Sequence, residues 1–228
     1  MSADAYQGAA PPLERLLAGA RAGAEQLIAA LRKATRDLSA LSLNYNGHSV
    51  RAGLRGADIH EIDAALNDAA TSLARTLFDL QQRLLLDVLT LSGLARIERV
   101  VDLEDERPVA ERLAQGLDDY VGALGPHLAG TRSTVDALAV HLGILANNTE
   151  VAACRVGEAS SAPVEVFALI AGQMRALAAR LRAIADDLAI FEGTQEGYVE
   201  VVRRTPLPEA GDAHATNTRG PLWAGEVA

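Results

Sequence analysis

The sequence predicts an all-α protein, an elongated antiparallel four-helix bundle made of two helical hairpins. Nearly half of the 228 residues are apolar, yet only 4% are aromatic, so aliphatic side chains must form the core. Alanine and leucine favour helices, whereas the residues that favour strands are scarce. Apolar residues also recur at alternating spacings of three and four over long segments. This heptad pattern is typical of helices that pack lengthwise against other helices.

The first hairpin is expected over residues 11–100. Pro11 and Pro12 suit the start of a helix, where a missing N–H costs no hydrogen bond. We call the line of apolar residues along each expected helix its seam. The first seam weakens over residues 44–58, where three glycines indicate a turn. The first seam consists of Leu13, Leu17, Ala20, Ala24, Leu27, Leu31, Ala34, Leu38 and Leu41, and the second of Ile59, Ile62, Leu66, Ala69, Leu73, Leu77, Leu80, Leu84, Val88 and Leu91.

The second hairpin is expected over residues 108–193. A charged segment with Pro108 separates it from the first, and Gly125-Pro126 should kink or interrupt its first helix. A strict seam then runs from Phe167 to Phe191. The pattern fades after Gly193, so residues 1–10 are assigned to a disordered N-terminus and 194–228 to a flexible, disordered tail. Short connections between long helices imply antiparallel neighbours.

Composition and motifs argue against several classes of function. The net charge of −9 argues against a nucleic-acid partner, which would need a basic face. The single cysteine, Cys154, fits a reducing compartment. No apolar run approaches the ~20 residues that span a bilayer, and the N-terminus has no signal-peptide pattern, so we expect a cytoplasmic protein without membrane insertion. We recognise no phosphate loop, nucleophile motif or metal-ligand spacing, and we expect no enzyme activity, metal or cofactor.

A polar run, Asn147 to Glu150, follows the apolar repeat that runs from Leu113 to Leu145 in the third expected helix, shortly before that helix ends. Together with the Arg155-x-Gly157-Glu158 motif, it resembles the cytoplasmic signalling tip of methyl-accepting chemotaxis receptors. Asn148 matches the tip asparagine of that family. Ala152 stands where the family has a glutamate, and the turn here is about one helical turn longer. The return helix of the family is matched by Phe167, Ala171, Gln173, Met174, Arg175, Leu177 and Ala178.

The first half of the chain repeats this pattern more weakly. Asn44, Arg51 and Gly53 have the spacing of the tip asparagine, arginine and glycine in the second half. His48 then corresponds to Ala152. Two receptor-like hairpins in one chain could form the four-helix bundle that a receptor forms from two chains. We therefore expect both tips at one end of the rod, with their polar side chains facing partners rather than the core.

The resemblance implies a non-enzymatic cytoplasmic signalling or scaffold protein that acts by protein–protein interaction. Its implied partners are a histidine kinase or a coupling protein of a chemotaxis-like pathway, and a homodimer is also compatible with the pattern. Trp223 is added as an apolar anchor for a docking motif in the tail. The expected partner-binding residues are Asn44, His48, Arg51, Asn148, Arg155, Glu158 and Trp223.

Two alternatives remain open. Histidine phosphotransfer domains are four-helix bundles with an exposed phosphoacceptor histidine, and His48 would take that role. Arg51-Ala52 stands where those domains have Lys-Gly, and an arginine can bind phosphate through two hydrogen bonds. The other alternative is a purely structural coiled-coil protein without a role in signalling.

Overall fold

The computed structural model describes residues 12–51, 57–100, 106–157 and 161–204, and all of them are helical. The helices are α1 (Pro12–Arg51), α2 (Ala57–Val100), α3 (Glu106–Gly157) and α4 (Ser161–Arg204). At 1.5 Å per residue, these helices are about 60 to 80 Å long. The structure confirms the predicted all-α class and the elongated four-helix bundle.

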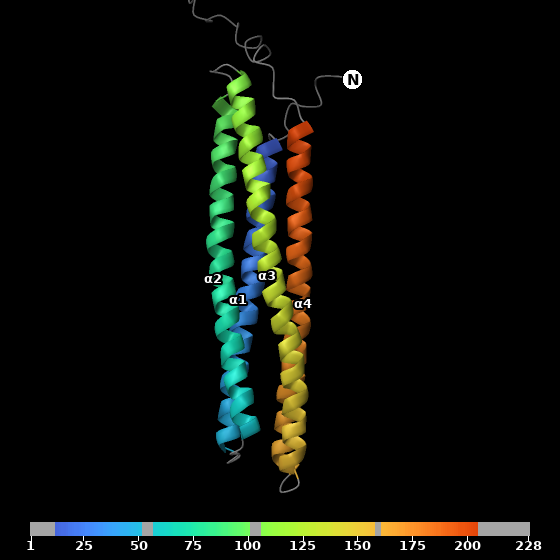
Figure 1. Cartoon of the computed structure of the whole chain (residues 1–228). Coiled ribbons are helices and arrows are strands. Elements are labelled where there is room, and N and C mark those ends of the chain that lie inside the picture. Colours follow the sequence, from blue (N-terminus) through green and yellow to red (C-terminus); the bar gives the residue numbers. More distant parts are fainter. Residues whose placement is uncertain (1–11, 52–56, 101–105, 158–160, 205–228) are drawn as a thin grey trace, which may run out of the picture.

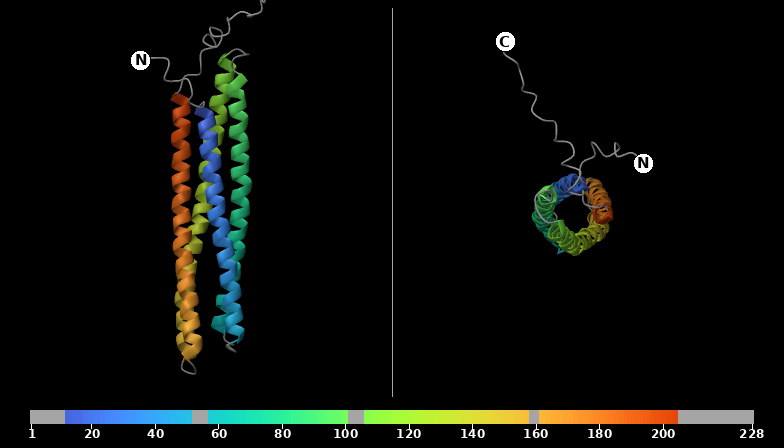
Figure 2. Two further views of the ribbon diagram at one scale, coloured as in Figure 1. Left: turned by 180° about the vertical axis from the view of Figure 1, so that it is seen from behind. Right: turned by 90° about the horizontal axis from the view of Figure 1, so that it is seen from above.

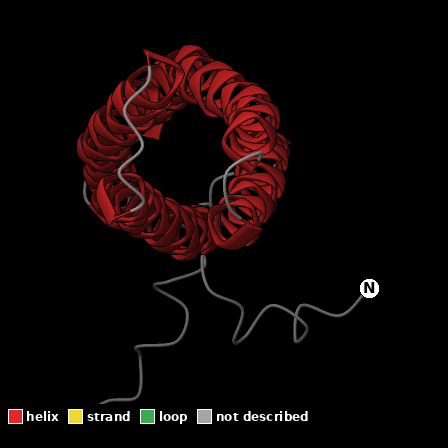
Figure 3. Ribbon diagram, turned by 90° about the horizontal axis from the view of Figure 1, so that it is seen from below, coloured by secondary structure: helices red, strands yellow, loops and turns green. Residues whose placement is uncertain are grey.

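The helices form a ring in which each is antiparallel to the one before it (Figures 1 and 2). Contacts join α1 to α2, α2 to α3, α3 to α4 and α4 back to α1, and the α3–α4 contact is the most extensive. The view along the axis shows the closed ring (Figure 3). The ends of α1 and α3 and the starts of α2 and α4 meet at one end of the rod (Figure 1), which we call the tip end (residues 41–51, 57–66, 145–157 and 161–170).

One continuous apolar core runs along the axis of the bundle, and leucine is its commonest large residue. Three seam positions differ from the predicted ones. Leu17 and Leu77 are only partly buried, and Leu16 is fully buried beside Leu17. Asp87 takes the core position that was predicted for Val88, because an apolar pattern cannot select an aspartate. None of the described helices is long and apolar enough to cross a membrane.

The helices are longer than the sequence pattern indicated. Helix α1 continues through Gly47 to Arg51, because Tyr45 and Ser49 are buried there. Helix α4 continues past Gly193 to Arg204. The boundary predicted at residue 193 is therefore wrong, and tertiary burial supports the last turns although the apolar repeat has faded.

Helix α3 passes through Pro126 without a break, so the predicted interruption does not occur. A proline leaves the carbonyl four residues earlier, here that of Gly122, without its helical donor. Gly122 and Pro126 are both exposed, so water can bind that carbonyl. Water bound there offsets part of the cost of the missing hydrogen bond.

The burial patterns of α1 and α3 coincide at the separation that aligns Asn44 with Asn148. Every buried residue of α1 except Leu27 has a buried counterpart 104 positions further along the chain in α3, and the counterpart of Leu27, Thr131, is partly buried. Helices α1 and α3 therefore use largely equivalent positions to pack around the shared axis. Examples are the pairs Leu13 and Leu117, Ala20 and Leu124, Ala24 and Leu128, Leu38 and Leu142, and Leu41 and Leu145.

Candidate functional site at the tip end

The core of the tip end contains Tyr45, the largest fully buried side chain of the described residues. Tyr45 of α1 is fully buried, and its ring meets that of Phe167 of α4 edge to face, with 5.6 Å between the centroids. Such aromatic pairs favour this geometry. Thr149 is also fully buried, and its hydroxyl donates to the Leu145 carbonyl at 2.7 Å. The contact between Tyr45 and Phe167 therefore joins α1 to α4 within the core of the tip end.

The polar run Asn147–Glu150 does not form one surface, and the expectation that it faces partners is wrong in part. Thr149 belongs to the core. Arg175 of α4 donates to both carboxylate oxygens of Glu150 at 2.6 Å and to Oδ1 of Asn147 at 3.1 Å. The hydrogen bond to Arg175 lowers the pKa of Glu150, and its counterpart raises the pKa of Arg175. Three of the four residues therefore stabilise the α3–α4 hairpin.

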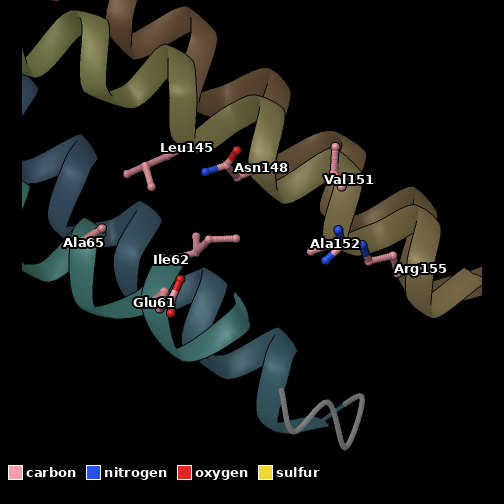
Figure 4. Close-up of a pocket in the computed structure, with 8 residues that line it drawn as sticks. All are labelled: Glu61, Ile62, Ala65, Leu145, Asn148, Val151, Ala152 and Arg155. Atoms are coloured by element: carbon pink, nitrogen blue, oxygen red, sulfur yellow. The ribbon is translucent and has the colours of Figure 1, made fainter. Parts of the chain in front are cut away.

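Asn148 instead lines a cleft of about 390 Å³ between α2 and α3. Figure 4 shows the side chains of the two helices facing each other across this gap. Ile62 and Leu145 are buried and form its floor. We call this site the tip cleft. Its lining residues are Glu61, Ile62 and Ala65 of α2, and Leu145, Asn148, Val151, Ala152 and Arg155 of α3.

The rim of the tip cleft combines an apolar side chain with opposite charges on its two sides. Glu61 lies on α2 and Arg155 on α3, and both are exposed. Val151 of α3 also lines the cleft and is 51% exposed. Asn148 adds an amide that can both donate and accept hydrogen bonds. The arrangement suits recognition of a peptide segment, with apolar contact at the floor and polar contact at the rim.

The other predicted residues of the first half lie on a different side of the bundle. Ser42 and Asn46 of α1 bond to Asn67 and Asp63 of α2, each at 2.8 Å, so this flank of α1 faces α2. The opposite flank faces α4, where Arg180 pairs with Asp37 of α1. Asn44, one heptad beyond Asp37, continues this flank.

Asn44 and Arg51 are exposed and His48 is half-buried, and His48 and Arg51 follow Asn44 at helical spacings of four and three. The structure confirms that Asn44 and Asn148 share one end of the rod, each about two turns before its helix ends. They do not share one site, since Asn44 lies toward α4 and Asn148 toward α2. Glu158, Gly53 and Trp223 lie outside the described residues.

Sequence reasoning missed a polar layer inside the other half of the bundle. Asp87 of α2 is only 9% exposed, and Tyr120 of α3 and Gln195 of α4 are buried beside this level of the core. The Tyr120 hydroxyl donates to Oε1 of Gln195 at 3.3 Å. Burial raises the pKa of Asp87 to about 6, although the nearby Arg83 guanidinium opposes this. Burial, and secondarily the Asp87 carboxylate, raise the pKa of Tyr120.

Arg83 links this layer to the surface of α3. Its Nη1 lies 2.6 Å from Nε2 of His127. Partial burial, and secondarily Arg83, lower the pKa of His127, so the neutral ring accepts the hydrogen bond at Nε2. The heptad position of Asp87, between Leu84 and Leu91, was the sequence signal for this layer.

The described helices contain no group of three His, Cys, Asp or Glu side chains placed to hold a metal ion. No family model matches the chain, and neither a curated protein nor a solved structure shows significant similarity to it.

Proposed function

We propose that the protein is a non-enzymatic cytoplasmic signalling or scaffold protein that binds a protein partner through the tip cleft. The resemblance to the chemoreceptor signalling tip suggests the partner class, a histidine kinase or coupling protein of a chemotaxis-like pathway. The observation that carries the proposal is the cleft itself. Asn148 and Arg155, two residues of the receptor-like motif, line it together with an exposed valine over an apolar floor.

The position of these residues supports recognition rather than a structural role. Asn148 and Arg155 are exposed, while the neighbouring Thr149 and Ala153 supply the core contacts of the same helix turns. Substituting an exposed side chain typically changes stability by less than 0.5 kcal/mol. The tip cleft can therefore be altered without unfolding the bundle, which makes the proposal testable.

Cys154 provides a reporter for the experiment, because it is the only cysteine of the chain and is exposed next to Arg155. We would attach an environment-sensitive dye to it and titrate a purified chemotaxis histidine kinase and its coupling protein. A saturable change in emission is expected with one of them. Asn148→Ala should weaken this binding, whereas Asp136→Ala, an exposed change farther up α3, should not. Equal binding by both variants would contradict a role for the cleft.

The two arginines of the motif give a second test. Arg51→Ala with Arg155→Ala should leave the melting temperature nearly unchanged, since both side chains are exposed. The double variant should lose partner binding. Unfolding of this variant would show that the arginines are structural. Unchanged folding together with unchanged binding would leave the resemblance without a retained function.

The phosphotransfer alternative makes a different demand on the same end of the rod. It needs a receiver domain to reach His48, which is half-buried on the α1 flank toward α4. Incubation with a phosphorylated receiver domain should leave the protein unlabelled under our proposal. Acid-labile label that disappears in His48→Gln would favour phosphotransfer. Failure of both assays would favour the purely structural alternative.

A further inference from the structure

A groove between α1 and α4 lies in the half of the rod away from the tip end. The two helices are neighbours in the ring (Figure 2), and the groove between them has a volume of about 380 Å³. It is lined by residues of α1 between positions 19 and 27 and by residues of α4 between positions 187 and 195. We call it the α1–α4 groove.

The floor of the α1–α4 groove is apolar. Gly23 of α1 has no side chain, and a methyl group there would lie 2.5 Å from the ring of Phe191. That ring therefore packs against the backbone of α1, beside the buried Leu27. Close helix packing explains these small and apolar residues by themselves. The polar side chains of the groove are what point to a ligand.

Gln195 is the buried polar residue of the groove. It is 1% exposed, and its Oε1 accepts a hydrogen bond from the Tyr120 hydroxyl at 3.3 Å. Its Nε2 donates to no residue of the four described helices, although it is not completely enclosed by them. A buried donor without a partner costs free energy. Since Gln195 lines the groove, this amide favours a ligand with a hydrogen-bond acceptor.

The other polar groups of α4 in the groove can only accept hydrogen bonds. The Thr194 hydroxyl donates its hydrogen to the Ile190 carbonyl at 2.7 Å, which leaves its oxygen as an acceptor. Asp187 is exposed, and its carboxylate forms no ion pair with the described part of the chain. Asp187 and Gln195 are about 12 Å apart along α4. This distance leaves room for one ring or a short chain between them.

The basic residues on the facing flanks of α1 and α4 leave Asp187 available. Arg180 of α4 pairs with Asp37 of α1. In this register Asp187 lies opposite Ala30, and Lys33 is about one helical turn nearer the tip end. Lys33 does not line the groove, and it forms no ion pair within the described ranges. Asp187 therefore gives the groove a negative charge at one end.

We propose that the α1–α4 groove binds a primary amine that carries a hydroxyl group at the opposite end of an apolar body. The ammonium would donate to Asp187, and the body would pack on Phe191 and Leu27. The hydroxyl would accept from Nε2 of Gln195 and donate to the oxygen of Thr194. A carboxylate or phosphate ligand fits poorly, because Asp187 and Thr194 would offer it acceptors alone.

The site is independent of the tip cleft and adds a ligand to the proposed function. Helices α1 and α4 belong to different hairpins, so a ligand in the groove would contact both. A ligand that binds only the folded bundle also stabilises it. Saturation with the amine should therefore raise the melting temperature.

The test uses tyramine, which carries an ammonium group and a hydroxyl on either side of one phenyl ring. Isothermal titration of the full chain should give a Kd of about 0.1 to 1 mM, as expected for a ligand of about ten heavy atoms. Two matched compounds are the controls. 4-Ethylphenol lacks the amine and should bind at least tenfold more weakly, and phenethylamine lacks the hydroxyl and should bind at least threefold more weakly.

Three protein variants assign the site. Asp187→Asn should weaken tyramine binding at least tenfold. Asp186→Asn changes the adjacent exposed carboxylate, which does not line the groove, and should alter binding less than twofold. Ala22→Phe, at an exposed lining residue, should fill the groove and abolish binding. All three changes are at exposed positions, so circular dichroism should show unchanged helix content.

Several results would overturn the proposal. Equal binding by Asp187→Asn and Asp186→Asn would remove the role of the carboxylate, and equal binding of tyramine and 4-ethylphenol would show an adventitious apolar contact only. No heat of binding, or no rise in melting temperature, would show that the groove takes no such ligand. Loss of binding in Asn148→Ala would place tyramine in the tip cleft. The chain has one tryptophan, Trp223; a shift of its emission in Ala22→Phe, without ligand, would identify the tail as occupant.

Discussion

Replacing Asp87 with asparagine should stabilise the bundle at neutral pH. Asp87 occupies a core position between Leu84 and Leu91, and it accepts no hydrogen bond from another residue of the described helices. An ionised carboxylate without such donors is costly to bury. Asparagine keeps the shape of the side chain and removes the charge.

The size of the expected stabilisation follows from the pKa of Asp87, which is about 6, against 3.8 for an unperturbed aspartate. A shift of about two units corresponds to at most about 3 kcal/mol. The side chain keeps some contact with solvent, and Arg83 lies nearby, so screening should leave about 1 to 2 kcal/mol.

The direction of the pKa shift determines how the contribution of Asp87 to the free energy of unfolding depends on pH. Because the pKa is raised in the folded state, the folded protein holds this proton more tightly than the unfolded chain. The contribution is fully stabilising below about pH 4 and is lost as the pH rises through 6. The free energy of unfolding of Asp87→Asn should therefore equal that of the wild type near pH 4 and exceed it at pH 7.

The measurement is urea denaturation, followed by circular dichroism at 222 nm, at several pH values between 4 and 7.5. The difference between wild type and variant isolates Asp87 from all other titrating groups. Asp136→Asn, an exposed change on α3, is the control and should show a difference below about 0.5 kcal/mol at every pH. A loss of stability in Asp87→Asn at pH 7, or a difference that does not depend on pH, would refute the reasoning.

Three further predictions concern packing and chemistry. A methyl group at position 23 would lie 2.5 Å from the ring of Phe191, so Gly23→Ala should lower the free energy of unfolding by about 1 to 3 kcal/mol in urea denaturation. The control is Gly93→Ala, which has open space around it and should raise the free energy of unfolding by up to about 1 kcal/mol. Tyr45→Ala removes a fully buried ring and should lower the free energy of unfolding by about 3 to 5 kcal/mol, and a loss below 1 kcal/mol would contradict the packing described at the tip end. Label from a phosphorylated receiver domain should be absent, and therefore unchanged in His48→Gln.

The sequence by itself determined the fold class and the two-hairpin plan. Heptad spacing of leucine and alanine requires each helix to bury a stripe, and short connections leave antiparallel neighbours as the simple solution. It also located the end of the rod where receptor-like residues gather. These properties depend on local periodicity, which a reader can count along the chain.

Only the tertiary structure decided which polar residues are free to bind. Asn147 and Asn148 are adjacent in the sequence, yet one accepts a hydrogen bond from Arg175 of α4 and the other lines a cleft against α2. Adjacent helical residues point about 100° apart, so their roles depend on which helix stands on each side. The same reason applies to the exposed leucines of α2, such as Leu85 and Leu86. Whether such a leucine contacts a neighbouring helix or water depends on the order of the helices around the ring, which no single helix encodes.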